Sequence, residues 1–108
     1  MASFSTGRRV AIVDGLRTPF AKSGTALASQ TTLELATAVV TELLARSGVD
    51  PASVDRVVYG SVVQDIAAPN SAREIVLAGP LPQTVDAYSV SRACATSTQT
   101  TVNAAQAI

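Results

Sequence analysis

Cys94 is the only cysteine in the chain, and it lies among small and polar residues at positions 91–97. An extended run precedes this stretch, and residues 101–108 form a small-residue run typical of a helix. The first turn of a helix presents unpaired N–H groups and a partial positive charge, which favour an anion. A thiol placed there can have its pKa lowered far enough to supply a thiolate at neutral pH. The stretch therefore predicts a nucleophile at the N-terminal end of a helix, and Arg92 would add to the effect if its side chain points toward the thiol.

The same stretch also fits a structural cysteine, because free cysteine is among the most buried residue types and packs as a small hydrophobe. No charged residue occurs from Ala93 to Ile108. A helix without a charged face is typical of one that is buried all round. The sequence thus predicts that Cys94 begins a central, buried helix, and it leaves the reactive and the structural interpretation both open at this point.

Other kinds of site find little support in the residue types. The chain contains no histidine, so no Cys–His pair can form within it. One cysteine without histidine also argues against a transition-metal site, and no metal is expected. There is no glycine-rich phosphate-binding loop, and we interpret Gly15, Gly24 and Gly60 as turn residues.

The charged residues suggest structural roles more than catalytic ones. Asp86 occupies a polar position in a predicted strand, and Arg73 and Glu74 fit a solvated helix surface, with an interaction site as the alternative. Arg17 either contacts an acidic group of a ligand or partner, or makes a hydrogen bond to the neighbouring turn. Cys94 is therefore the one nucleophile candidate.

Composition limits the class of protein. The 108 residues suffice for one small domain, and because only 4% are aromatic, the core must be built from Ala, Val, Leu and Ile. The formal net charge is zero, with 8 basic and 8 acidic residues, which argues against nucleic acid as a partner. A single cysteine excludes an internal disulfide and fits a reducing compartment. No apolar segment approaches the roughly 20 residues that span a bilayer, so a soluble, cytoplasmic protein without a transmembrane segment is expected.

Strands and helices are expected to alternate along the chain. Thr31 and Glu34 match a capping box, which opens a helix that ends at Gly48. Asn70 can cap a second helix. The expected elements are strands at residues 10–13, 54–64 and 84–90, and helices at residues 31–48, 70–78 and 101–108. This β-α-β-α-β-α order predicts an α/β fold with three layers, α-β-α, behind a flexible tail at residues 1–8. The last helix lacks a C-terminal stop signal, which suggests a fragment.

Several separated motifs occur in the same order in thiolases, and they cover nearly the whole chain beyond its tail. These motifs lie at residues 10–13, 17–20, 60–64, 70–74 and 91–97. The chain therefore resembles the thiolase family. Many thiolases have Asn-Arg-x-Cys followed by a Ser-Gly pair, whereas this chain has Ser-Arg-Ala-Cys-Ala-Thr-Ser. That version, together with residues 68–77, is most similar to the thiolase (β) subunit of the fatty-acid β-oxidation trifunctional complex.

The resemblance implies a fold, and it implies which part of that fold this chain would form. The family's N-terminal domain has a mixed five-stranded sheet, of which this chain would supply the first three strands. Residues 9–108 would be a truncated N-terminal portion of that domain. The motifs at residues 17–20 and 70–73 would serve as scaffold or subunit interface.

The resemblance also implies an activity, that of a 3-ketoacyl-CoA thiolase (acetyl-CoA C-acyltransferase) in fatty-acid β-oxidation. Cys94 would attack the keto carbon, release acetyl-CoA and hold the shortened acyl chain as a thioester until coenzyme A takes it. The backbone N–H of Cys94 would be one oxyanion-hole donor. Coenzyme A and 3-ketoacyl-CoA would be substrates, with no bound cofactor. The assembly would be a homo-oligomer, with the α-subunit of a β-oxidation complex as a further partner.

Two alternatives stay open. One is a biosynthetic acetoacetyl-CoA thiolase, which the departure from the Ser-Gly pattern argues against. The other is a non-catalytic structural or interaction fragment. The family's base histidines and second cysteine are absent from these residues, so the 108-residue chain alone is expected to be inactive.

Overall fold

The computed structural model describes residues 7–108, and the rest of the predicted tail lies outside the described residues. Three α-helices, two short 3-10 helices and two strands follow one another along this part of the chain. They are α1 (Thr32–Ser47), η1 (Pro51–Ser53), β1 (Arg56–Gly60), α2 (Ser71–Ala78), β2 (Asp86–Val90), η2 (Ala93–Ala95) and α3 (Thr96–Gln106).

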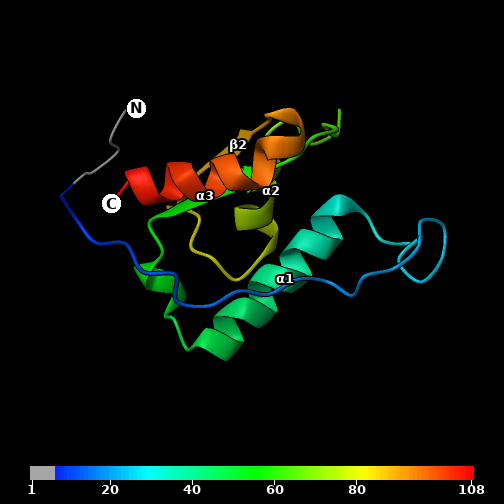
Figure 1. Cartoon of the computed structure of the whole chain (residues 1–108). Coiled ribbons are helices and arrows are strands. Elements are labelled where there is room, and N and C mark those ends of the chain that lie inside the picture. Colours follow the sequence, from blue (N-terminus) through cyan, green and yellow to red (C-terminus); the bar gives the residue numbers. More distant parts are fainter. Residues whose placement is uncertain (1–6) are drawn as a thin grey trace.

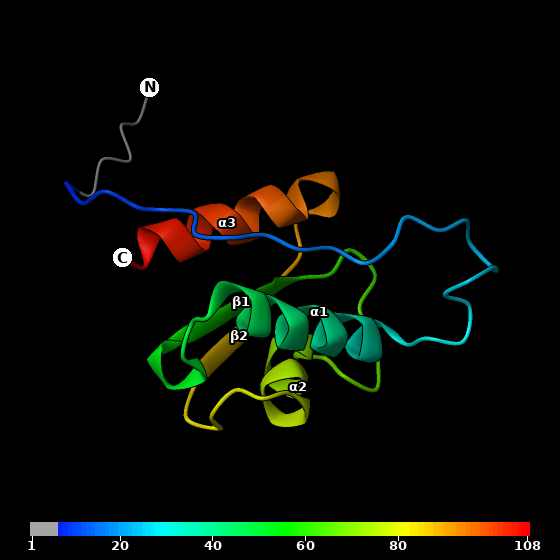
Figure 2. The same ribbon diagram turned by 90° about the horizontal axis from the view of Figure 1, so that it is seen from below.

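The two strands form a parallel sheet that separates two helical layers. The register runs from Arg56 opposite Asp86 to Gly60 opposite Val90. Figures 1 and 2 show α3 on one side of the sheet and α1 and α2 on the other. The predicted α/β class with α-β-α layers is therefore confirmed, although the described residues contain two strands and not three.

Helix α1 begins with the predicted capping box. The Glu34 N–H donates to Thr31 Oγ1 at 3.2 Å, and the Thr31 N–H donates to the Glu34 carboxylate at 2.7 Å. These hydrogen bonds hold the pKa of Glu34 below its usual value. Gly48 ends the helix in the left-handed conformation, with φ of 68°. Local sequence signals thus placed both ends of α1 to within a residue.

The core lies between the sheet and the layer of α1 and α2. Ile75 and Val76 of α2 are the largest fully buried side chains. Partly buried side chains from α1, β1 and β2 complete this core; they are Val40, Leu44, Val54, Val57 and Ala87, packed against Val76, Leu81 and Val85. As predicted from the composition, aliphatic side chains build it.

The expected strand at residues 10–13 is wrong. These residues run without regular secondary structure, and Ile12 and Val13 are 85% and 76% exposed. They lie over α1, where both side chains line a shallow hollow together with Leu43 and Leu44. A strand exists only through hydrogen bonds to a neighbour, and an apolar run predicts burial without specifying which edge it pairs with.

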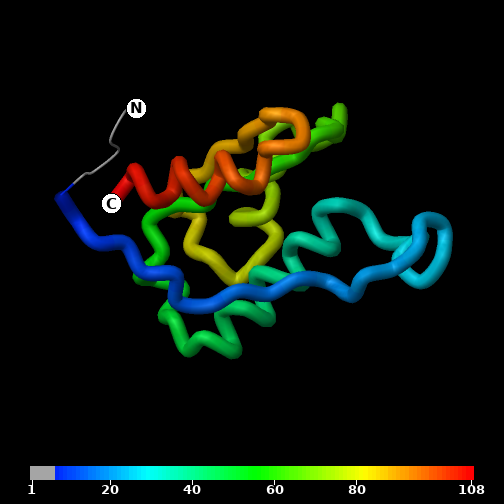
Figure 3. The backbone as a smooth tube through the Cα atoms, viewed as in Figure 1, coloured from blue at the N-terminus to red at the C-terminus, as the bar shows by residue number. Residues whose placement is uncertain are grey.

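Residues 19–31 connect this extended segment to α1 through successive turns. The Thr25 N–H donates to the Lys22 carbonyl at 3.2 Å, and the Ala28 N–H donates to the Thr25 carbonyl at 3.0 Å. Figure 3 shows the connection as a loop that projects from the body of the molecule. The interpretation of Gly24 as a turn residue is confirmed, and its φ is 75°.

Two further elements differ from the sequence prediction. Strand β1 is shorter than the predicted 54–64, and Val63 beyond it is 85% exposed. Helix α3 starts at Thr96, five residues before the expected 101–108 helix, and Thr96 is its one buried residue. The expectation of a helix buried all round was therefore wrong, because the α3 sequence is uncharged but rich in the polar residues Thr, Asn and Gln.

Candidate active site

Cys94 lies where the second strand of the sheet gives way to a helix. Strand β2 ends at Val90, Cys94 is the middle residue of η2, and α3 begins at Thr96. Gly60 and Val90 are paired at the ends of their strands, so the turn stands at the carboxyl edge of the sheet. Open α/β sheets bind their ligands outside this edge. The position at a helix start is as predicted, but Cys94 is exposed and not buried.

The turn that carries Cys94 has an unusual backbone. Ala93 has φ of 45°, and it is the one non-glycine residue with positive φ among the described residues. A side chain in this left-handed region costs about 1–3 kcal/mol and persists only where surrounding contacts impose it.

The side chain of Thr96 supplies two of those contacts. The Arg92 N–H donates to Thr96 Oγ1 at 2.8 Å, and Thr96 Oγ1 donates to the Ala93 carbonyl at 2.7 Å. The Ala95 N–H also donates to the Arg92 carbonyl at 3.0 Å. The hydroxyl of Thr96 therefore bonds both to the left-handed Ala93 and to the residue before it, Arg92.

Gly60 allows the N-terminal end of α3 to pack closely against the sheet. A Cβ at Gly60 would lie 2.4 Å from Thr96 Cγ2 and 3.1 Å from Thr100 Cγ2. Only a residue without a side chain permits this approach. The interpretation of Gly60 as a turn residue was wrong: it is the last residue of β1, and it is needed for helix packing.

Arg92 is turned along α3. Its guanidinium donates to Gln99 Oε1. The amide of Gln99 in turn donates to Asn103 Oδ1 at 2.6 Å. Tyr59 of β1 faces the other side of the sheet, where it lines a hollow with Val39 and Val40 of α1. Its partial burial raises the pKa of the phenol above the usual value near 10, so the phenol stays neutral. The expected action of Arg92 on the thiol stays a prediction.

A polar network fixes α2 to the strand that leads to Cys94. The Ala72 N–H donates to Ser89 Oγ at 3.0 Å, and Ser89 Oγ donates to Asn70 Oδ1 at 2.9 Å. The Asn70 amide donates to the Ala87 carbonyl at 3.1 Å, and Asn70 Oδ1 also caps α2 as predicted. This motif therefore acts as scaffold for β2.

Arg73 strengthens the same connection. Its guanidinium donates to the carbonyl oxygens of Gln83 and Val85, at 2.8 and 3.2 Å. It thereby holds the loop that enters β2, and its interpretation as solvated helix surface was wrong.

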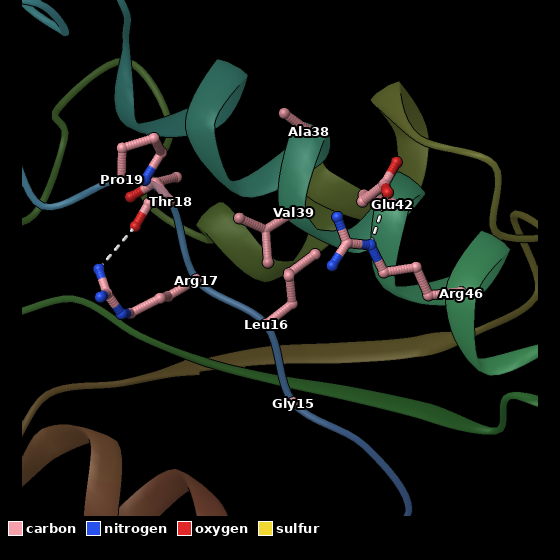
Figure 4. Close-up of a pocket in the computed structure, with 9 residues that line it drawn as sticks. All are labelled: Gly15, Leu16, Arg17, Thr18, Pro19, Ala38, Val39, Glu42 and Arg46. Atoms are coloured by element: carbon pink, nitrogen blue, oxygen red, sulfur yellow. Dashed lines mark hydrogen bonds and ion pairs between the residues drawn. The ribbon is translucent and has the colours of Figure 1, made fainter.

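A broad, open surface hollow of about 900 Å³ lies elsewhere, and no thiol lines it. It is formed by residues 15–19 against α1, as Figure 4 shows, and Cys94 is not part of its lining. Arg17 donates to the adjacent Thr18 carbonyl at 3.1 Å, which matches the structural alternative predicted for it. Glu42 and Arg46 pair with each other at 2.7 Å.

Residues 7–108 contain no group of three or more metal-binding side chains that could hold an ion. In the same part of the chain, no helix is both long enough and apolar enough to cross a bilayer.

Comparison with known protein families shows to which family the chain belongs. Residues 10–108 match the family described as "Thiolase, N-terminal domain". The chain belongs to the thiolase family. It is 58% identical over 102 residues to a 3-ketoacyl-CoA thiolase of Shewanella pealeana, and 56% identical over 104 residues to that of Shewanella frigidimarina. These alignments cover 94% and 96% of this chain, but only 23% and 24% of the two relatives.

Solved thiolase structures share the fold of this chain. The crystal structure of a Bacillus anthracis acetyl-CoA acetyltransferase superposes with a TM-score of 0.74 at 39% sequence identity, covering 79% of this chain and 22% of that one. The Acat5 thiolase of Ascaris suum, in complex with coenzyme A, gives a TM-score of 0.80 at 26% identity, covering 85% and 24%. The thiolase fold expected from the sequence motifs is thus confirmed.

Sequence reasoning found Cys94 but missed the two residues that fix its surroundings. Thr96 was visible only as a small polar residue two positions after the cysteine. Gly60 was visible only as a glycine near the end of an apolar run. No local signal would have found them, because Gly60 and Thr96 belong to elements that are far apart in the chain.

Proposed function

We propose that this chain is the N-terminal part of a 3-ketoacyl-CoA thiolase (acetyl-CoA C-acyltransferase) whose nucleophile is Cys94. One observation carries the proposal: Cys94 is exposed at the carboxyl edge of the sheet, in a turn that the Thr96 hydroxyl holds by hydrogen bonds. The identity of 56–58% to proteins named 3-ketoacyl-CoA thiolase supports the substrate class. Residues 9–108 would then form a truncated portion of the thiolase N-terminal domain.

In this reaction the Sγ of Cys94 attacks the C3 carbonyl carbon of 3-ketoacyl-CoA. The bond between C2 and C3 breaks, C2 takes up a proton, and acetyl-CoA leaves. The shortened acyl group stays on Cys94 as a thioester until the thiol of coenzyme A attacks it and restores the free cysteine. The groups that move these protons lie outside this chain, which contains no histidine.

The backbone also has a part in this chemistry. The first N–H groups of a helical turn have no partner within the turn. We therefore infer that the Cys94 N–H donates to the negative charge that develops on the attacked carbonyl oxygen. Coenzyme A and acyl-CoA take part as substrates, and the proposal requires no bound cofactor or metal.

The biological setting is part of the proposal. The resemblance to the β subunit of the trifunctional complex favours fatty-acid β-oxidation in the cytoplasm, with a homo-oligomer that can associate with an α-subunit. Since the chain spans about a quarter of the relatives that it matches, the 108 residues alone should not turn over 3-ketoacyl-CoA.

Two measurements test the proposal. The first is the intact mass of the native protein from its source, which should be several times 11.0 kDa. The second is thiolysis of 3-ketoacyl-CoA by that protein and by its Cys94→Ala variant. We expect the variant to lose thiolysis and the wild-type Cys94 to react with iodoacetamide faster than free cysteine. Retained thiolysis in Cys94→Ala, together with an ordinary alkylation rate, would show that Cys94 is not the nucleophile.

A second candidate is a biosynthetic acetoacetyl-CoA thiolase. The structural likeness to the Bacillus anthracis acetyl-CoA acetyltransferase favours it. Rates with short and long 3-ketoacyl-CoA substrates distinguish the two, because a degradative enzyme should prefer the longer chains. The non-catalytic alternative predicts no thiolysis by the native protein with either substrate.

A further inference from the structure

The turn that presents Cys94 depends on one hydroxyl group. We propose that Thr96 is a positioning residue for Cys94, acting by bridging the backbone of Arg92 and Ala93 across the left-handed peptide. This inference rests on the proposed function for its meaning in catalysis, but its structural content can be tested separately. Thr96 is not a catalytic residue in this scheme, because its hydroxyl is occupied by the turn.

The Thr96 hydroxyl both donates and accepts a hydrogen bond within the turn. A hydroxyl offers one donor and two acceptor lone pairs. Here the donor goes to the Ala93 carbonyl at 2.7 Å and an acceptor takes the Arg92 N–H at 2.8 Å. Both bonds are sheltered, since Thr96 is 3% exposed. Hydrogen bonds removed from water cost more to lose than exposed ones.

The methyl group of Thr96 fixes the same side chain through a separate contact. Thr96 Cγ2 lies so close to Gly60 that a Cβ at that glycine would be 2.4 Å away. Its methyl group therefore holds the residue against β1, while its hydroxyl holds the turn. These two contacts connect the edge of the sheet to the peptide that precedes Cys94.

The two parts of Thr96 can be separated by substitution. Thr96→Val keeps the shape and the methyl contact with Gly60 but removes the hydroxyl. Thr96→Ser keeps the hydroxyl and removes the methyl. Thr100→Val is a matched control, because its Cγ2 also faces Gly60 while its hydroxyl bonds only to the Ser97 carbonyl within the helix.

The primary measurement is amide hydrogen exchange in the full 108-residue chain. We expect exchange at the Arg92 N–H to rise about tenfold in Thr96→Val, and to stay near the wild-type rate in Thr96→Ser and Thr100→Val. The proposal is overturned if Thr96→Val leaves that exchange unchanged, or if Thr96→Ser raises it equally. If Thr96→Val does not fold, Thr96→Ser is compared with Thr96→Ala, since both lack the methyl and only serine keeps the hydroxyl.

Iodoacetamide provides the functional readout, since Cys94 is the sole thiol of the chain. The alkylation rate should fall toward that of free cysteine in Thr96→Val and remain high in Thr96→Ser, whereas a purely structural role would lower the unfolding temperature and leave the rate of the folded protein unchanged. In the native protein, the same substitution should lower kcat for thiolysis about tenfold with little change in KM. If wild-type thiolysis is absent, the proposed function fails, while the Arg92 exchange data still decide the role of Thr96.

Discussion

Helices α2 and α3 lie on opposite faces of the sheet and are held there by different means. Helix α2 has eight residues, of which Ser71, Ala72, Ile75 and Val76 are buried. Helix α3 has eleven residues, and only Thr96 is buried. Buried side chains on most of its turns fix α2, whereas full burial in α3 is confined to the end where Cys94 lies.

This difference indicates that α2 mainly stabilises the fold, whereas α3 mainly positions the turn that carries Cys94. Apolar burial by α2 supplies stability, because the free energy gained grows with the area removed from water. The contact of α3 with Gly60 supplies position, since it places one turn at the strand end while contributing little buried area. The following substitutions test this division.

The largest effect is expected from the buried side of α2. Ile75 is 1% exposed, so Ile75→Ala should lower the free energy of unfolding by about 2–5 kcal/mol, through lost burial and the cavity left behind. The matched control is Ile66→Ala at a side chain that is 96% exposed, and it should change stability by no more than about 0.5 kcal/mol. Urea unfolding measures the stability of both variants. Equal losses would show that burial by α2 does not supply the stability.

A smaller but more local loss is expected from Gly60→Ala. The added methyl group would overlap Thr96 Cγ2, so α3 must shift, at a cost of about 1–3 kcal/mol. Gly15→Ala is the control, because a Cβ there meets no atom within 4 Å. Alkylation of Cys94 should change only in the Gly60 variant. Unchanged stability and reactivity in Gly60→Ala would mean that α3 is not held at this point.

The two helix caps provide a finer comparison. Thr31→Ala removes a cap that bonds only within α1, and it should cost about 0.5–2 kcal/mol. Asn70→Ala removes a cap that also bonds to Ser89 and to the Ala87 carbonyl. Its cost should exceed that of Thr31→Ala by about 0.5–1.5 kcal/mol in urea unfolding. A smaller loss for Asn70→Ala would show that the link from α2 to β2 is not stabilising.

The smallest effect is a pH dependence at α1. Hydrogen bonds from Thr31 hold the pKa of Glu34 below its value in the unfolded chain. The stabilisation is therefore present above the unfolded pKa, near 4.3, and disappears as the pH falls through the folded pKa. Circular dichroism should show α1 fraying between neutral and acid pH. In Glu34→Gln this part of the pH dependence should vanish, and if it persists, another carboxyl group is responsible.

Local signals explain what the sequence predicted well. The capping box of Thr31 and Glu34 and the cap at Asn70 depend on residues three positions apart, so they are readable from the sequence alone. The position of Cys94 between a strand and a helix was predicted for the same reason.

Two of the failures involve contacts between distant residues, and a third comes from the interpretation of uncharged residues. The apolar run at residues 10–13 indicated a strand, but strand formation depends on which edge is available, and no local pattern specifies that. The close approach of Gly60 and Thr96 joins residues that are far apart in the chain. A lack of charge in α3 was interpreted as burial, although Thr, Asn and Gln are equally free of charge and remain in water.

The contact of Gly60 with Thr96 constrains how related sequences can diverge. Alanine at position 60 becomes acceptable only when position 96 has no γ-methyl group. Serine at 96 would keep the hydroxyl and remove the 2.4 Å contact, which leaves Thr100 Cγ2 at 3.1 Å as the next neighbour. Substitutions at these two positions should therefore be correlated during evolution, with alanine at 60 accompanied by serine at 96. A library randomised at both positions and selected for folding would recover such pairs together more often than either change alone.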